Sequence, residues 1–252
     1  DIVRIEKNKA KFISKNWKRS YKKDEGGGEY RILQNGKVFE KVGVNFSKVY
    51  GKFPKQFQKN IPGANKDPRF WASGISGVMH MKNPLIPAMH FNTRYINTTY
   101  GWFGGGMDVT PSKFDKKEKE KFHKILKKMC DRHNKNFYKR YKKWCDEYFY
   151  LPHRKEARGI GGIFFDYKKN NFEKDFKFVR EVGTTFELIF KKIIKKKLKK
   201  KWTLRDKEMQ YIKRGRYTEF NLLYDRGTKF GLQTGGNVEG ILMSLPPIAK
   251  WK

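Results

Sequence analysis

Side chains that could exchange protons and bind carboxylates gather in one short stretch of this 252-residue chain. In residues 89–97 the even positions are His90, Asn92 and Arg94, and the alternation of a β-strand points all three to one face. Histidine titrates near neutral pH and can shuttle a proton, while the planar arginine fork binds a carboxylate with two hydrogen bonds. This pattern indicates chemistry on an acidic substrate; the ordinary alternative is a polar, solvated sheet face.

A second stretch, residues 75–81, adds Ser76 and His80 on a common strand face. If the two stretches pair as a hairpin with His80 opposite His90, Ser76 lies opposite Arg94. The intervening turn contains two prolines, which cannot continue either strand. We therefore predict one polar patch made by two neighbouring strands.

The segment Gly101–Pro111 follows within a few residues and contains three consecutive glycines. Trp102 and Phe103 supply an apolar wall, and Asp108 adds a carboxylate that could accept hydrogen bonds from N–H groups of a ligand. The spacing matches no phosphate-binding loop. We interpret the glycines as a loop whose bare backbone a ligand can approach closely, with a plain glycine-rich hairpin loop as the alternative.

Composition predicts a folded, strongly basic protein. Hydrophobic residues make up 37% of the chain and aromatic residues 16%, which is ample for a core, and the net charge is +34. Such a charge attracts polyanions, so a nucleic-acid-binding protein is one alternative, with eight lysines in residues 191–201 as its contact. The excess lysine is spread along the chain, however, and a lysine-rich helix end is commonly solvated. The field also favours a small polyanionic substrate.

Several classes of protein are disfavoured. Cys130 and Cys145 form no C-x-x-C pair and no metal-ligand spacing, which indicates a reducing compartment and no disulfide framework. No apolar run is long enough to span a membrane, and no flavin, nicotinamide, haem or iron–sulfur motif occurs. Both chain ends look trimmed, so we expect a fragment of a longer protein.

The length allows one large domain or two small ones, and periodicity predicts an α+β fold on a mainly antiparallel sheet. Residues 1–70 are polar and mixed, with a turn at 26–28. Helices are predicted from Asp115, over 136–151 and over 173–200, where apolar residues recur at helical spacing. The predicted strands are 75–81, 89–97, 160–166, 216–224 and 238–245.

At these motifs the chain closely resembles the oxygen-dependent coproporphyrinogen III oxidase family, bacterial type. The resemblance covers roughly residues 25–252. The matching segments are long and in the same order: 80–95, 102–111, 140–151, 158–166 and 215–236, continuing to Leu245-Pro-Pro.

The resemblance implies aerobic oxidative decarboxylation of the propionates on rings A and B of coproporphyrinogen III. The products are the two vinyl groups of protoporphyrinogen IX, in haem synthesis, with O2 as oxidant and CO2 and H2O2 released. It implies no organic cofactor, and argues against a nucleic-acid partner. It further implies a single domain over residues 1–252, built on a large flat mainly antiparallel sheet flanked by helices on both faces. A homodimer formed through the carboxyl-terminal part and a cytoplasmic location are also implied.

Site roles follow from the same resemblance, residue by residue. His90 matches the family's proton donor, and Asp108 matches the carboxylate that holds the pyrrole N–H groups; Arg94 completes the predicted catalytic set. The predicted substrate-binding residues are Ser76, Asn92, Thr93, Arg94, Asp108, Gly235, Gly236 and Asn237.

Two further points concern metal and a departure from the family pattern. His80, His90, His123 and His153 could gather around a divalent metal cation, and the resemblance matches His80, His123 and His153 to positions assigned to such a metal in the family. Asn237 replaces the family's usual arginine, and Gly240 stands where serine is common. Because the arginine would anchor a propionate, an inactive tetrapyrrole-binding homologue is the alternative function.

Overall fold

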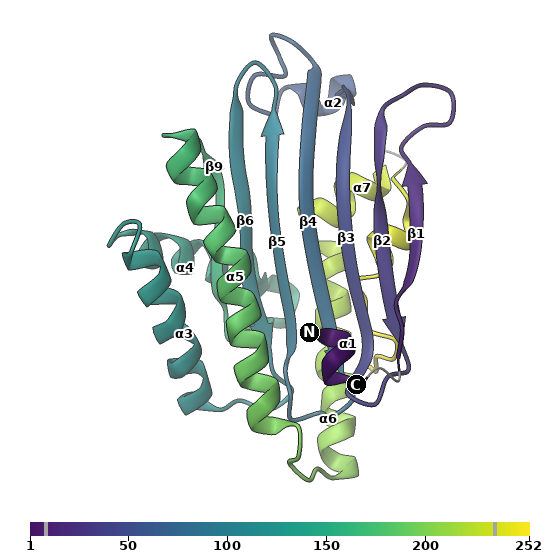
Figure 1. The fold of residues 1–252 in the computed structure, drawn as a ribbon, viewed down its shortest axis with the longest axis vertical. Helices are drawn as coiled ribbons and strands as arrows, with labels where there is room; N and C mark the ends of the chain where they lie inside the picture. The colour runs from purple at the N-terminus through teal and green to yellow at the C-terminus, as the bar shows by residue number, and fades with distance from the viewer. Residues whose placement is uncertain (8–9, 234–235) are drawn as a thin grey trace.

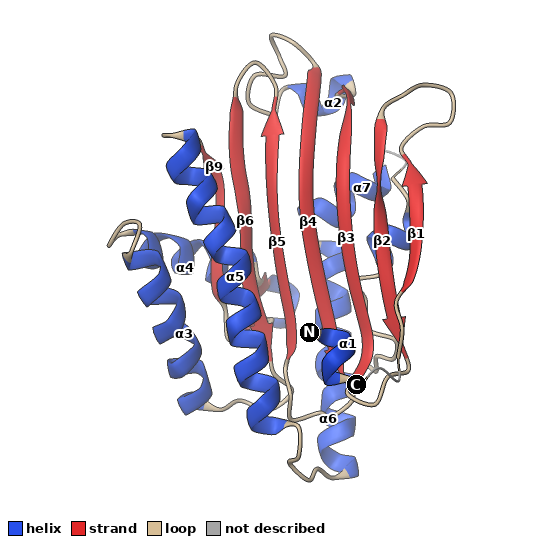
Figure 2. Ribbon diagram, in the orientation of Figure 1, coloured by secondary structure: helices blue, strands red, loops and turns tan. Residues whose placement is uncertain are grey.

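A seven-stranded antiparallel sheet forms the centre of the computed structural model, which describes residues 1–7, 10–233 and 236–252 (Figures 1 and 2). The spatial order of the strands is β1-β2-β3-β4-β5-β6-β9. Their bounds are β1 Ile13–Lys18, β2 Gly26–Gln34, β3 Phe39–Lys52, β4 Arg69–Met81, β5 Ala88–Asn97, β6 Gly101–Thr110 and β9 Gly162–Lys168. A separate two-stranded ribbon pairs β7 (Tyr150–Leu151) with β8 (Glu156–Ala157).

Helices cover both faces of this sheet. Figure 1 shows α3 (Lys116–Asp131), α5 (Phe172–Lys197) and the short α1 (Ile2–Ile5) on the near face. Behind the sheet lie α6 (Leu204–Leu223) and α7 (Arg226–Gln233), and α8 (Val238–Leu242) also contacts that face. The short elements α2 (Lys55–Gln58) and η1 (Pro152–Arg154) lie in connections. The predicted α+β fold with a mainly antiparallel sheet flanked on both sides is confirmed.

The main core lies between the sheet and α5. The apolar stripe predicted for 173–200 faces inward at Val179, Phe186, Phe190 and Ile193, which are all buried. Phe91 of β5 packs on Phe186 with ring centroids 4.7 Å apart. Because odd-numbered residues of β5 fill this core, the even-numbered ones are turned to the opposite face.

Two helix predictions are confirmed together with their starts. Asp115 is the N-cap of α3 and accepts a hydrogen bond of 2.9 Å from the backbone N–H of Glu118. Helix α4 (Phe137–Tyr148) lies in the predicted 136–151 segment and packs along the edge strand β9. The lysine-rich end of α5 is not uniformly solvated, because Lys197 is buried and pairs with Glu118.

Three local predictions are wrong. Residues 216–224 and 238–245 are not strands, since they lie in α6 and in α8 with the turn after it. Their aromatic and branched residues favour strands locally, but Thr203 and Asp206 form a capping box that starts α6, and Tyr217 and Phe220 fall on its buried side. The predicted turn at 26–28 is instead the start of β2, one of three strands within residues 1–70.

Candidate active site

The predicted polar face is built by β4, β5 and β6, in a register that differs from the prediction. His90 lies opposite Val78, and Ser76 lies opposite Asn92. The predicted pairing of His80 with His90 is therefore wrong by two residues. A shift of two residues preserves the face, so the predicted residues of β4 and β5 still point to one side.

The three glycines form part of strand β6, and the prediction of a loop is wrong. Gly104 lies opposite Arg94, Gly106 opposite Asn92, and Asp108 opposite His90. A Cβ atom on Gly104 would lie 2.5 Å from Oδ1 of Asp166 and 2.8 Å from Cζ of Arg94. Glycine at this position therefore leaves room for the Arg94–Asp166 ion pair.

One continuous hydrogen-bonded chain of side chains crosses this face. His90 Nδ1 lies 2.8 Å from Oδ1 of Asp108, and Arg94 donates to Asn92 at 3.1 Å and to Asp166 at 2.7 Å. Asn92 Nδ2 closes the gap at 3.3 Å from His90 Nε2. In order, the chain runs Arg158, Asp108, His90, Asn92, Arg94, Asp166.

This hydrogen-bonded series of side chains fixes the tautomer of His90. The Asp108 carboxylate only accepts hydrogen bonds, so Nδ1 of His90 carries the proton. Nε2 then holds the lone pair and accepts from the Asn92 amide, whose oxygen accepts in turn from Arg94. His90 and Arg94 are only partly buried, with 18% and 30% of their side chains exposed. A ligand above the sheet can therefore reach a basic nitrogen and a guanidinium.

Asp108 is held ionised beneath them. Burial alone would raise the pKa of its carboxyl group, but the Arg158 guanidinium and the His90 hydrogen bond outweigh burial and hold that pKa below its usual range. Arg158 donates to Oδ2 of Asp108 at 2.6 Å. Its own guanidinium lies between aromatic rings, 4.0 Å from the centroid of Phe149 and 4.6 Å from those of Tyr217 and Phe220.

Small side chains surround the polar chain and make a flat floor. Two cross-strand rows lie on this face, with glycine, serine and asparagine at most positions. One row is Gly28, Ser47, Gly74, Arg94 and Gly104, and the next is Tyr30, Asn45, Ser76, Asn92 and Gly106. Every residue from β2 to β5 in these rows except Tyr30 is half-buried, so the floor is accessible. Ser76 takes its predicted place in it, next to Asn92.

Thr93 and the carboxyl-terminal residues lie elsewhere. Thr93 is turned to the face opposite His90, next to Ile75 and Gly105 in the ladder, so its side chain is not part of the row. Asn237 is the N-cap of α8, and its side-chain oxygen accepts from the N–H of Gly240 at 2.8 Å.

The two glycines predicted to bind substrate, Gly235 and Gly236, precede this N-cap. Gly236 donates its N–H to the carbonyl of Gly231 at 2.8 Å. Gly235 lies outside the described residues. Within this segment, the structure thus assigns a role to the side chain of Asn237, which caps α8.

The four histidines predicted as metal ligands do not come together. His80 donates from Nε2 to the carbonyl of Ser244, and His123 donates from Nε2 to that of Ile160. Within residues 1–7, 10–233 and 236–252, no group of three or more His, Cys, Asp or Glu side chains is placed to hold a metal ion. The donor set therefore does not fit a shared divalent cation.

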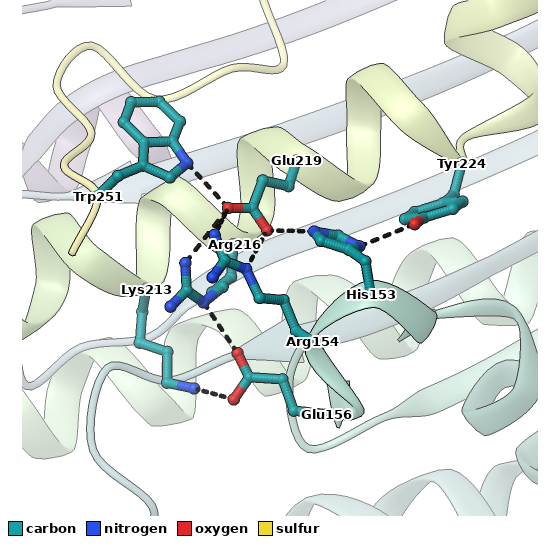
Figure 3. Close-up of polar contacts among 8 residues, drawn as sticks. All are labelled: His153, Arg154, Glu156, Lys213, Arg216, Glu219, Tyr224 and Trp251. Carbon is teal, nitrogen blue, oxygen red and sulfur yellow. Dashed lines mark hydrogen bonds and ion pairs between the residues drawn. The ribbon is translucent and has the colours of Figure 1, made fainter.

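His153 belongs to a different cluster, centred on Glu219 of α6 (Figure 3). Its two ring nitrogens lie 2.7 Å from Glu219 and 2.8 Å from the Tyr224 hydroxyl. The Glu219 carboxylate also accepts from Arg154, Arg216 and Trp251. Arg154 and the other donors lower the pKa of Glu219 to about 2. This cluster joins η1 to α6, and so helps to seat Arg158, which follows η1, against Tyr217.

Four contributors to this face were missed by reasoning from the sequence: Arg158, Asp166, Asn45 and Ser47. The first two lie in the matched segment 158–166, but nothing in their spacing links them to Asp108 or Arg94. The alternation of Val42, Val44 and Phe46 with polar residues was a signal for β3, and with it for Asn45 and Ser47.

Comparison with known proteins bears on the whole chain. The family described as Coproporphyrinogen III oxidase matches residues 1–252. The chain belongs to this family. The match includes every strand of the sheet and every residue of the hydrogen-bonded chain.

Similar curated proteins carry one name, oxygen-dependent coproporphyrinogen-III oxidase. Those of Rickettsia rickettsii (strain Sheila Smith) and Rickettsia bellii (strain RML369-C) are each 57% identical over 243 residues, covering 96% of this chain and 86% of the relative. The protein of Rickettsia africae (strain ESF-5) is 56% identical over the same shares. None of the helices in the described part of the chain has the length and apolarity to cross a bilayer.

Proposed function

We propose that this chain is an oxygen-dependent coproporphyrinogen III oxidase of haem biosynthesis. It converts the propionates on rings A and B of coproporphyrinogen III into the vinyl groups of protoporphyrinogen IX. The observation that carries this proposal is the series of hydrogen-bonded side chains that begins at Arg158 and ends at Asp166 on an accessible sheet face. It lies in a protein 57% identical to enzymes of that name.

The overall reaction sets what the site must do. Each propionate, with one proton and one O2, gives a vinyl group, CO2 and H2O2. The bond to the carboxyl carbon breaks, and its electron pair forms the vinyl double bond as a hydrogen leaves the neighbouring carbon. The two electrons lost from the side chain reduce O2. We propose that no organic cofactor takes part, because the electron-rich macrocycle supplies the electrons to O2 directly.

Arg94 suits the role of carboxylate anchor. Its guanidinium is partly exposed and already aligned by Asn92 and Asp166. A propionate can pair with the donors that these two partners leave free, since arginine has five N–H groups. This fixes the reacting side chain above the floor, and fixing it lowers the entropic part of the barrier.

His90 suits the proton-transfer role, and Asp108 supports it. With Nδ1–H held by Asp108, the lone pair lies on Nε2, and a substrate proton reaches it when the Asn92 amide that now donates to it turns away. When Nε2 takes a proton, Asp108 stabilises the resulting imidazolium. Contact between Asp108 and pyrrole N–H groups requires a neighbouring side chain such as His90 or Arg158 to move, because the carboxylate is buried beside them.

The floor suits a macrocycle. Ser47, Gly74 and Ser76 present short side chains, so a broad ring can approach the sheet closely while its polar edge meets Arg94. The basic composition of the chain attracts the four propionates.

We extend the proposal to the protein's context. Residues 1–252 act as one catalytic domain, the protein works in the cytoplasm, and it forms a homodimer through its carboxyl-terminal part. Exposed apolar side chains in that part, Leu223, Leu232, Val238 and Ile248, support such a contact.

The decisive experiment is a product assay with coproporphyrinogen III under air and under nitrogen. We expect protoporphyrinogen IX only under air, and no turnover in either condition would refute the proposal. Arg94→Lys should raise KM by about tenfold or more, because lysine cannot reproduce the two-sided fork. Arg132→Lys, on an exposed helix pair with Glu181, is the matched control and should be unchanged.

A further inference from the structure

A small cavity lies one row along the sheet from His90 and Asp108. It has a volume of about 20 Å³ and lies between the sheet and α6. Its inner wall includes His80, Thr110, Arg214 and Tyr217, with Met81 and Gln210 beside them, and its rim includes Ser112 and Lys213. The inner residues are at most 6% exposed, whereas the two rim residues are half-buried.

Three polar atoms of the inner wall have no hydrogen-bond partner among the described residues. They are Nδ1 of His80, Oγ1 of Thr110 and Nη1 of Arg214. A buried polar group without a partner loses its hydrogen bonds to water and gains none in return, which destabilises the folded state. Three such groups around one cavity therefore point to an occupant that satisfies them together.

The chemistry of the three atoms selects the occupant. His80 donates from Nε2 to the Ser244 carbonyl, so Nδ1 carries a lone pair and needs a donor. Arg214 offers N–H and needs an acceptor, and the Thr110 hydroxyl can do either. We infer that the cavity binds one water molecule, which donates to His80 Nδ1, accepts from Arg214 Nη1 and bonds Thr110 Oγ1.

Other occupants fit less well. An anion would face the lone pair of His80, and a cation would lie against the Arg214 guanidinium. Burial and the charges of Arg214, Lys41 and Arg158 lower the pKa of His80 to about 3, and the field that opposes its protonation also opposes a divalent metal. A cavity needs only about 10–15 Å³ and polar partners to hold a water, and the three unpaired atoms supply those partners.

Replacing Thr110 tests the inference by the sign of its effect. Thr110→Val keeps the shape and removes the hydroxyl. If a water bonds Oγ1, the melting temperature should fall by about 3 °C or more, since 1 kcal/mol corresponds to about 2–4 °C for a protein of this size. If the cavity is empty, removing an unpaired hydroxyl leaves the melting temperature unchanged or raises it. The control, Thr110→Ser, keeps the hydroxyl, so its melting temperature should fall less than that of Thr110→Val.

Crystallography of the unmodified chain gives an independent readout. We expect one density peak about 2.7–3.2 Å from all three atoms. An empty cavity would overturn the inference. So would an anomalous signal there after a bromide soak, which identifies an anion, or after a zinc soak, which identifies a metal.

Discussion

Removing Arg158 should destabilise the protein strongly, because it leaves the buried charge of Asp108 without its ion-pair partner. The two side chains are 2% and 3% exposed and their charged atoms lie 2.6 Å apart. Breaking a buried ion pair by removing one partner costs about 3–5 kcal/mol. In Arg158→Met the hydrogen bond from His90 remains, while contacts of the guanidinium with Phe149, Tyr217 and Phe220 are lost. We therefore expect a loss of about 4 kcal/mol, the middle of that range.

Urea unfolding, followed by the fluorescence of the six tryptophans, measures this loss. Arg31→Met is the matched control, because Arg31 is 58% exposed in its pair with Glu29 and such pairs contribute about 1 kcal/mol or less. Adding Asp108→Asn to Arg158→Met removes the unpaired buried charge and should restore about 1 kcal/mol or more of the free energy of unfolding.

The deficit of Arg158→Met should also depend on pH. The pKa of Asp108 is depressed in the folded protein, so its pairing contributes stability above the unfolded value of about 3.9, and this is lost as pH falls through the folded pKa. Without Arg158 burial is less opposed, and the pKa of Asp108 rises. The deficit should shrink as pH falls from 7 towards 4. A loss under about 1 kcal/mol at pH 7, or a double variant no more stable than Arg158→Met, would refute the reasoning.

Three further predictions concern single positions. Gly104→Ala places a Cβ atom against Asp166 and Arg94, so kcat/KM should fall about tenfold or more; unchanged kinetics would show that the ion pair is not needed. The pKa of His80 is lowered to about 3, so between pH 6 and 4 this side chain binds a proton in the unfolded protein but not in the folded one. As the pH falls through this range, the free energy of unfolding should decrease by up to about 1.4 kcal/mol per pH unit, and His80→Gln should flatten that slope. Asn237→Arg removes the cap of α8, so denaturation should reveal a loss of about 1 kcal/mol, and a large gain in turnover would favour the inactive homologue for the unmodified chain.

The sequence alone determined which residues share a face. Strand alternation placed His90, Asn92 and Arg94 together whatever the register, and Ser76 joins them in any register shifted by an even number of residues. Helical periodicity and capping located α3 and α5, because both signals are local. The ordered motifs gave the family.

Only the tertiary structure decided what those residues contact. The register of β4 on β5 and the place of the triple glycine in β6 depend on packing across several strands, which no local pattern encodes. The pairing of Asp108 with Arg158, 50 residues away, and of Arg94 with Asp166, 72 residues away, arises where β5, β6, β8 and β9 converge. The histidines separated for the same reason: burial gave each a backbone or side-chain partner of its own, and those partners lie on elements that the sequence could not place in space.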